Sequence, residues 1–277
     1  MRRRRLFDLA IAGATALALT FLLLPLVAIF LRVPLGDLVS QLGSRVAVDA
    51  LIVTLETNAI AQALILVVGT PTAYFIASRR FRGRALAITL VELPLVLPPA
   101  VAGLALLAAF GRLGLLGSTF DVLGVTVSTG TKTAVILAVA YVASPFYIRG
   151  AIASFEALDQ PLLDASRTLG AGPARTFLRI ALPLAANGLG AAAALSFARG
   201  IGEFGATIMF AGSLQGVTQT LSLAIYQEFD VDFDTALAIG ALLVVGSALV
   251  LFAAKVIPAW RRSTSTSTTL FAPSASR

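Results

Sequence analysis

The sequence predicts an all-α integral membrane protein that crosses the bilayer six times. Of its 277 residues, 58% are apolar and only 13% are charged, about half the charged share of a soluble domain. A spanning helix takes about 20 mostly apolar residues. Stretches of that kind lie near 9–31, 51–78, 85–110, 133–154, 184–211 and 235–257. Together they define one membrane domain, 9–257, between a basic N-terminus, 1–8, and a Ser/Thr-rich tail, 258–277, whose composition predicts disorder.

Lysine and arginine fall mainly on one side of this topology. Most of them lie within 2–5, 79–84, 149–179 and 255–277, whereas the opposite side carries Arg32, Arg45, Arg112 and Lys132. Because cytoplasmic loops are enriched in Lys and Arg, both termini are expected in the cytoplasm, as in a multi-pass protein of the cell (plasma or inner) membrane. The net charge of +7 is then a topology signal, so nucleic acid is not an expected partner.

Two of the predicted spans have irregular features. The first, 9–31, follows the basic MRRRR and has a secretory signal as its alternative interpretation. It is longer than the roughly 7–15 apolar residues of a signal, and no small-residue cleavage site follows, which favours a retained span. The third contains Pro94, Pro98 and Pro99, which predict a kinked or broken helix.

The residue types exclude several kinds of chemistry. The chain has no Cys and no His, which excludes disulfides, thiolate or imidazole metal sites and histidine bases. The D-x-D-x-D of 230–234 lacks the glycine and distal glutamate of an EF-hand loop, so no metal site is predicted. No G-x-x-x-x-G-K-[ST] phosphate loop is present. We therefore expect no catalytic residue and no cofactor in this chain, and any ATP hydrolysis would need a separate subunit.

The loop 155–183 is the long loop on the basic side. Asp159 is placed to cap a helix, and Pro161 suits its first turn. Gly170 follows an apolar stripe, where a left-handed residue ends a helix, and Pro173 can open a second helix. Two short amphipathic helices are thus predicted. They could lie on the lipid interface or dock into a groove of a cytoplasmic partner, and amphipathicity suits both uses equally.

This loop resembles that of bacterial ABC importer permeases, whose pattern is E-A-A-x3-G-x9-I-x-L-P. The matching positions are Asp164, Ala165, Ser166, Gly170, Ile180, Leu182 and Pro183, with Asp in place of Glu and Ser in place of the second Ala. The resemblance implies a type I ABC importer permease fold. It also implies that the loop forms coupling helices seated in a cleft of an ATP-hydrolysing subunit, which would bind ATP and Mg.

Two ionisable residues lie inside the fifth predicted span. Arg199 and Glu203 are four residues apart, so they share a helix face and can pair. A centred charge costs roughly 2.5–3.5 kcal/mol in a membrane. Two interpretations stay open. The pair fixes this helix in the bundle, or it belongs to a translocation path or gate together with the neighbouring Gly202, Phe204, Gly205 and Thr207.

The segment GIGEFG, 200–205, also matches G-x-G-x-x-G, the glycine pattern of dinucleotide-binding turns. That turn needs a preceding strand in a soluble βαβ unit, and here an Ala-rich membrane helix precedes it, so the match is accidental. Instead, GEFGAT at 202–207, with TQTLSLAIY at 218–226, resembles the oxyanion group of binding-protein-dependent permeases, and most of all the molybdate permeases.

The resemblance implies a permease subunit of an ATP-driven molybdate importer. Its expected partners are a second copy of the chain, two ATP-binding subunits, an extracytoplasmic oxyanion-binding protein and membrane lipid. A sulfate or tungstate permease is the alternative. An ion-coupled secondary transporter that uses Glu203 is a further alternative from another class, disfavoured because the chain shows no internal repeat.

Overall fold

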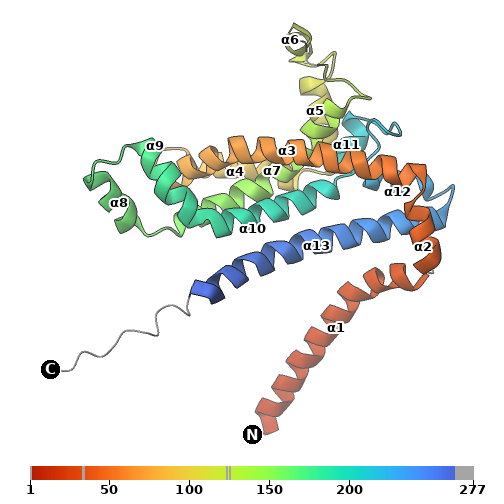
Figure 1. Ribbon diagram of the computed structural model, residues 1–277, viewed down its shortest axis with the longest axis horizontal. Coiled ribbons are helices and arrows are strands. Elements are labelled where there is room, and N and C mark those ends of the chain that lie inside the picture. The colour runs from red at the N-terminus through yellow and green to blue at the C-terminus, as the bar shows by residue number, and fades with distance from the viewer. Residues whose placement is uncertain (1, 33–34, 123, 125, 266–277) are drawn as a thin grey trace.

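The computed structural model describes all residues except 1, 33–34, 123, 125 and 266–277, and this part of the chain is helical (Figure 1). In chain order the helices are α1 (Arg2–Arg32), α2 (Leu35–Leu42), α3 (Arg45–Ser78), α4 (Arg84–Val96), α5 (Pro99–Phe110), α6 (Gly117–Val122), α7 (Lys132–Glu156), α8 (Gln160–Thr168), α9 (Pro173–Thr176), the π-helical turn η1 (Phe177–Ala181), α10 (Leu182–Ile201), α11 (Gly205–Phe210), α12 (Leu221–Glu228) and α13 (Phe233–Ser265).

Five helices of the described chain are long and apolar enough to cross a membrane: α1, α3, α7, the continuous Pro173–Ile201 and α13. The pair α4 and α5 makes a sixth span if the two helices, bent by 113°, are counted together. The break falls at Leu97, which precedes Pro98 and has an extended conformation with ψ 135°, as the residue before a proline prefers. The predicted six spans and the broken third span therefore agree with the structure, whereas Pro94 lies inside α4 without ending it.

The predicted extent of the fifth span, 184–211, is wrong. Helix α10 ends at Ile201, the chain turns through Gly202–Phe204, and α11 begins at Gly205. The Ala206 N–H donates to Oε1 of Glu203 at 2.8 Å, so this carboxylate caps α11. The predicted start of the tail at 258 also differs from the structure, because α13 runs through Ser265. Residues 258–265 are therefore helical, and 266–277 lies outside the described residues.

Helix α7 packs between α3 and α10, and small residues allow these helices to approach closely. A Cβ added to Gly150 of α7 would lie 2.6 Å from the Cβ of Ala192. Polar contacts tie the same helices together: Ser196 Oγ donates to Ala143 O at 2.9 Å, and Asn58 Nδ2 donates to Phe197 O at 3.0 Å. The result is a three-helix core that holds the end of α10 in place.

This packing predicts opposite effects for two glycines of α10. A Cβ at Gly200 would lie 2.2 Å from Asn58 Oδ1, whereas Gly190 has no neighbour within 4 Å. We expect Gly200→Ala to destabilise the protein by about 1–3 kcal/mol through overpacking. Gly190→Ala should be neutral or stabilising by up to about 1 kcal/mol, because alanine favours helix. Thermal unfolding of the purified variants in detergent measures both, and equal melting temperatures would contradict the close α10–α3 contact.

Helix α1 leaves the bundle at an angle, and Figure 1 shows that only the C-terminal end of α1 lies beside α13. Large apolar side chains along it, such as Leu17, Phe21 and Leu24, are exposed. Such a surface suits contact with lipid tails, as expected of a retained membrane span.

Candidate functional site: the helix breaks and the coupling element

Two helix breaks meet in the bundle. One separates α4 from α5 and the other separates α10 from α11. A Cβ added to Gly205 would lie 2.4 Å from the Cβ of Pro99, and one added to Gly103 would lie 2.6 Å from the Cβ of Met209. Glycine is therefore required at both positions for α11 to lie against α5.

The predicted Arg199–Glu203 pair forms beside this junction. Arg199 Nη2 lies 2.8 Å from Glu203 Oε2, with 30% of the arginine side chain and 1% of the glutamate side chain exposed. Glu203 has two roles, since its Oε1 accepts the Ala206 N–H. The pair thus joins the last turn of α10 to the first turn of α11 across the break.

Arg199 also lines a cavity of about 130 Å³ at the α4–α5 break. Pro94, Leu97, Pro99 and Phe146 are among its other walls. Arg199 is the charged residue among the walls of this cavity, and its guanidinium pairs with the buried Glu203. A partly balanced cation at a break between two membrane helices is suited to meeting an anion or to controlling a constriction.

The other residues predicted for the path or gate lie differently. The Phe204 ring lies 5.2 Å from the ring of Tyr226 in α12. Thr207 is fully buried, and its hydroxyl has no hydrogen-bond partner among the described residues. Gly202 is exposed, and a side chain there would meet nothing closer than 4.0 Å. A side chain at Gly205 or Gly200 would therefore meet close neighbours, whereas one at Gly202 would not.

Sequence reasoning missed three ion pairs that α7 makes within the described chain, one of which joins Glu156 to Arg84 of α4. Lys132 Nζ lies 2.6 Å from Glu56 Oε2 of α3, and Arg149 Nη1 pairs with Glu92 Oε1 of α4. Glu92 lies two residues before Pro94 inside α4. The partners are between 57 and 76 residues apart, so no local pattern could indicate them.

The loop 155–183 forms the two expected helices, α8 and α9, which project from one end of the bundle (Figure 1). Gly170 ends α8 with φ +84°. Gly170 N–H donates to Arg167 O at 2.9 Å, and Ala171 N–H donates to Ser166 O at 3.0 Å. This is the Schellman arrangement, which requires a left-handed residue. The expected conformation of Gly170 is therefore confirmed.

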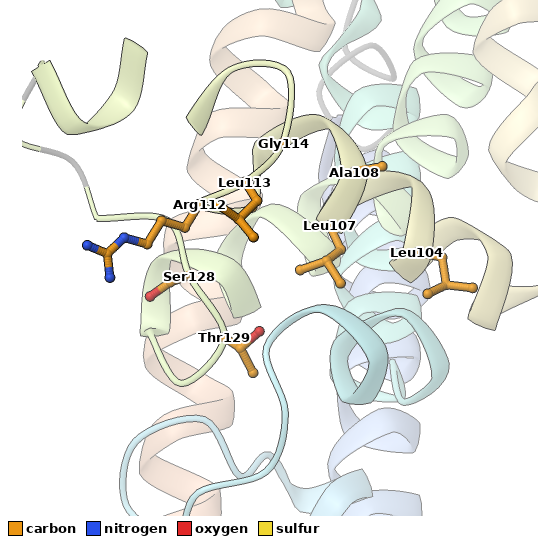
Figure 2. Close-up of a pocket in the computed structure, with 9 residues that line it drawn as sticks. Leu104, Leu107, Ala108, Arg112, Leu113, Gly114, Ser128 and Thr129 are labelled. Atoms are coloured by element: carbon orange, nitrogen blue, oxygen red, sulfur yellow. The ribbon is translucent and has the colours of Figure 1, made fainter. Parts of the chain in front are cut away.

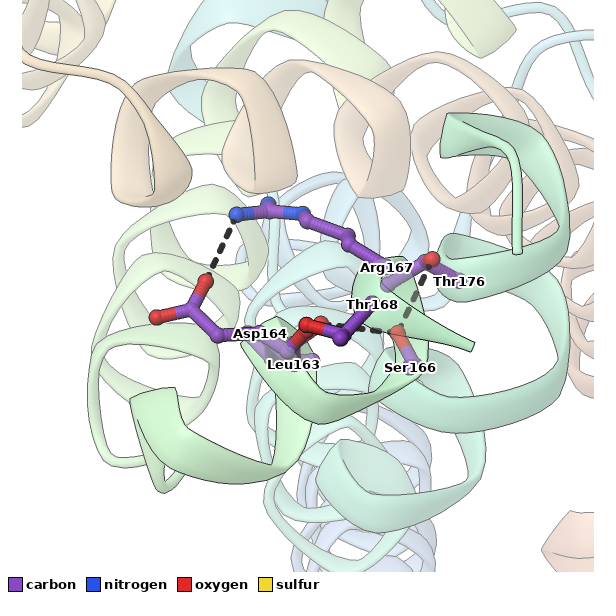
Figure 3. Close-up of polar contacts among 6 residues, drawn as sticks. All are labelled: Leu163, Asp164, Ser166, Arg167, Thr168 and Thr176. Carbon is purple, nitrogen blue, oxygen red and sulfur yellow. Dashed lines mark hydrogen bonds and ion pairs between the residues drawn. The ribbon is translucent and has the colours of Figure 1, made fainter. Parts of the chain in front are cut away.

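Ser166 ties the two helices of the loop together, as Figure 3 shows. Its hydroxyl donates to Leu163 O at 2.7 Å and lies 3.1 Å from Thr176 Oγ1 of α9, and both side chains are buried. Asp164 is exposed and pairs with Arg167 at 3.0 Å. Asp159 occupies the expected N-cap position of α8, but its side chain makes no capping hydrogen bond.

The apolar residues of the loop face in two directions. Leu163 belongs to the core, and Ile180 and Leu182 pack against that core. Leu162 and Leu169 are exposed at 50% and 88%. Ala165, on α8, and Pro183, in the first turn of α10, are also exposed. The loop is thus anchored to the bundle and still presents an apolar surface to the outside, which fits a docking element.

The Ser166–Thr176 contact predicts a measurable coupling. Ser166→Ala should cost about 1–3 kcal/mol, because it leaves the buried Thr176 hydroxyl unpaired. Adding Thr176→Val should recover most of that loss, since no unpaired group then remains. A double-mutant cycle on thermal unfolding measures the interaction, and strictly additive effects would show that the two hydroxyls are independent.

A second cavity, of about 590 Å³, lies between α5 and the segment before α7 (Figure 2). Its walls are mainly aliphatic and include Leu104, Leu107 and Leu113. The guanidinium of Arg112 extends away from Leu104 and Leu107. The glycine-rich segment 111–119 is folded back here, with Leu115 N–H donating to Ala108 O at 3.0 Å. Ser128 and Thr129 are its polar walls besides Arg112, and the Thr129 hydroxyl already donates to Phe210 O at 3.2 Å. With few free polar groups, this cavity is poorly suited to an oxyanion.

The bundle, with its two meeting helix breaks and projecting helical pair, is that of a multi-pass membrane protein. The chain belongs to the family described as binding-protein-dependent transport system inner membrane component, whose model matches residues 69–262. It is 40% identical over 241 residues to the molybdenum transport system permease protein ModB of Mycobacterium tuberculosis, covering 87% of this chain and 89% of that protein. It is 39% identical over 179 residues to ModB of Escherichia coli, covering 64% and 78%.

Solved structures support the fold. A bacterial alginate ABC transporter in complex with its periplasmic protein gives a TM-score of 0.71 at 18% identity, with 91% of this chain and 93% of that chain covered. The MetNI methionine ABC transporter gives 0.61 at 19% identity, with 76% and 94% covered. The expected all-α fold of an ABC importer permease is thereby confirmed.

Proposed function

We propose that this chain is the permease subunit of an ATP-driven molybdate importer. The observation that carries the proposal is the 40% identity, over most of both chains, to a permease named for molybdenum transport. The GEFGAT segment, 202–207, supports it as well, because it resembles the corresponding segment of molybdate permeases. The chain itself is a transport component.

The proposed assembly contains two copies of this chain, two ATP-binding subunits and an extracytoplasmic oxyanion-binding protein. The exposed apolar residues of α8, Leu162 and Leu169, support docking of an ATP-binding subunit. The sequence has no phosphate loop of its own, so ATP and Mg would be bound by that partner. The basic clusters at the α8–α9 end support a cytoplasmic location for this end and for both termini.

A mechanical link supports the proposed roles of the two sites. We call α8 and α9 together the coupling element. One continuous helix, Pro173–Ile201, starts with α9 of this element and ends two residues before Glu203. Closure of the ATP-binding subunits would move α8 and α9, and this rigid helix would carry the movement to the break that holds Arg199 and Glu203. The coupling residues are thus Asp159, Asp164, Ala165, Ser166, Gly170, Ile180, Leu182 and Pro183, and the gate residues are Arg199, Gly202, Glu203, Phe204, Gly205 and Thr207.

Uptake measurements test the substrate. A strain that lacks its own molybdate and sulfate permeases, and that expresses this chain with an ATP-binding subunit and an oxyanion-binding protein from the same organism, should take up labelled molybdate. Sulfate uptake without molybdate uptake would favour the sulfate alternative and contradict the proposal. Parallel uptake measurements with labelled tungstate show whether the transporter prefers molybdate or tungstate.

Co-purification tests the mechanism class. A tagged version of this chain should retain an ATP-binding subunit during purification. Uptake should stop when the phosphate-loop lysine of that subunit is replaced so that it no longer hydrolyses ATP. Uptake that continues without ATP hydrolysis would instead support the ion-coupled transporter.

A further inference from the structure

A basic cavity lies at the root of the coupling element, where four helix ends meet. Its volume is about 410 Å³. It is bounded by the end of α3, the start of α4, the end of α7 and the first residue of α8. Its polar walls are Ser78, Arg79, Arg80, Arg84, Glu156 and Gln160.

The charges of this cavity do not cancel. Arg84 is already engaged, since its Nε donates to Ile76 O at 2.9 Å and its Nη2 pairs with Glu156. The Glu156 carboxylate is therefore neutralised by Arg84. Arg79 and Arg80 form no ion pair with a carboxylate of the described chain, and both are exposed. Two uncompensated cations thus face a concave site, which suits a phosphate group.

The surface next to the cavity is apolar and lies on a membrane helix. The Arg79 guanidinium lies 5.1 Å from the centre of the Phe75 ring, and Phe75 lies 5.3 Å from the Phe81 ring. Leu64, Val68 and Phe75 are all exposed and fall at helical spacing along one side of α3. An exposed apolar stripe therefore leads along α3 to the basic cavity, and the rings of Phe75 and Phe81 lie next to the arginines.

We propose that this cavity binds the phosphate of an anionic phospholipid from the leaflet on the basic side, with Arg79 and Arg80 as its cationic ligands. The acyl chains lie along the Leu64–Val68–Phe75 stripe. A free phosphate would use the arginines but not the stripe. A partner protein would contact the arginines, but the exposed apolar stripe of α3 beside them suits lipid tails. Basic pockets between membrane helices bind anionic headgroups by this chemistry.

The test measures lipid retention by the full-length purified chain. Native mass spectrometry with dioleoyl phosphatidylglycerol and dioleoyl phosphatidylcholine in equal amounts should show preferential retention of phosphatidylglycerol. The double variant Arg79→Gln/Arg80→Gln should bind phosphatidylglycerol about thirtyfold more weakly, because each cation near an anionic lipid contributes about fivefold. If the double variant is not recovered, Arg80→Gln alone should lose about fivefold.

Arg82→Gln is the matched control, because Arg82 lies in the same exposed segment but does not line the cavity. Its phosphatidylglycerol binding should equal that of the unchanged protein. An equal loss in Arg82→Gln, or no loss in the double variant, would overturn the proposal. So would displacement of the lipid by excess inorganic phosphate. Loss of the co-purified ATP-binding subunit from the double variant, with lipid binding unchanged, would identify a protein-docking surface instead.

Discussion

Gly170→Val is expected to abolish most transport while the permease still inserts into the membrane. The glycine has φ +84°, and its Cβ position has no neighbour within 4 Å, so the effect comes from the backbone alone. A left-handed conformation costs an ordinary residue roughly 1–2 kcal/mol, and a β-branched residue is less tolerant still. The population of the native turn should therefore fall at least about tenfold. In the remaining molecules α8 would no longer keep its native orientation relative to α9. Uptake in membrane vesicles, with the amount of inserted protein measured by immunoblot, is the readout.

Gly170→Asn is the matched control for this prediction. Asparagine adopts the left-handed conformation more readily than other non-glycine residues, and open space at this position leaves room for its side chain. We expect uptake near that of the unchanged protein. Equal loss in both variants would point to the added side chain blocking the partner rather than to the turn, whereas full activity of Gly170→Val would refute the coupling role of α8.

Arg199→Leu should be strongly destabilising. Removal of the arginine leaves the carboxylate of Glu203, which is 1% exposed, buried without its partner. Breaking a buried pair from one side typically costs about 3–5 kcal/mol. The hydrogen bond from Ala206 N–H remains and offsets part of this. The melting temperature of the detergent-purified variant measures the loss, and an unchanged value would show that the ion pair contributes nothing to stability.

The double variant Arg199→Leu/Glu203→Gln separates the two interpretations of this pair. Glutamine keeps an acceptor for Ala206 N–H and carries no charge, so stability should recover substantially. If the pair belongs to the gate, molybdate uptake should remain low in the recovered protein. Normal uptake by the double variant would assign the pair a purely structural role.

The local features of this protein were predictable because short-range chemistry decides them. Glycine at 170 follows an amphipathic stripe and must end a helix, which predicted its left-handed turn. Arg199 and Glu203, one turn apart, could be paired from spacing alone. The broken third span followed in the same way from Pro98, since a proline constrains the residue before it.

Contacts between distant segments were not predictable. The end of the fifth span at Ile201 depends on Glu203 capping α11 and on Gly205 lying against Pro99. The partner of Glu92 is Arg149, 57 residues away. Hydrophobicity along the chain is the same whether GEFG continues a helix or breaks it, so periodicity could not place the boundary there.

By itself, therefore, the sequence determined the membrane class, the number of spans, their side-to-side charge bias and the turns of the loop 155–183, because each depends on solvent transfer or on backbone rules within a few residues. Only the tertiary structure decided which helix breaks meet, that Ser166 holds Thr176, and that Arg79 and Arg80 share a cavity beside α8. Those features arise from close packing, in which each side chain takes a partner that its own segment does not contain.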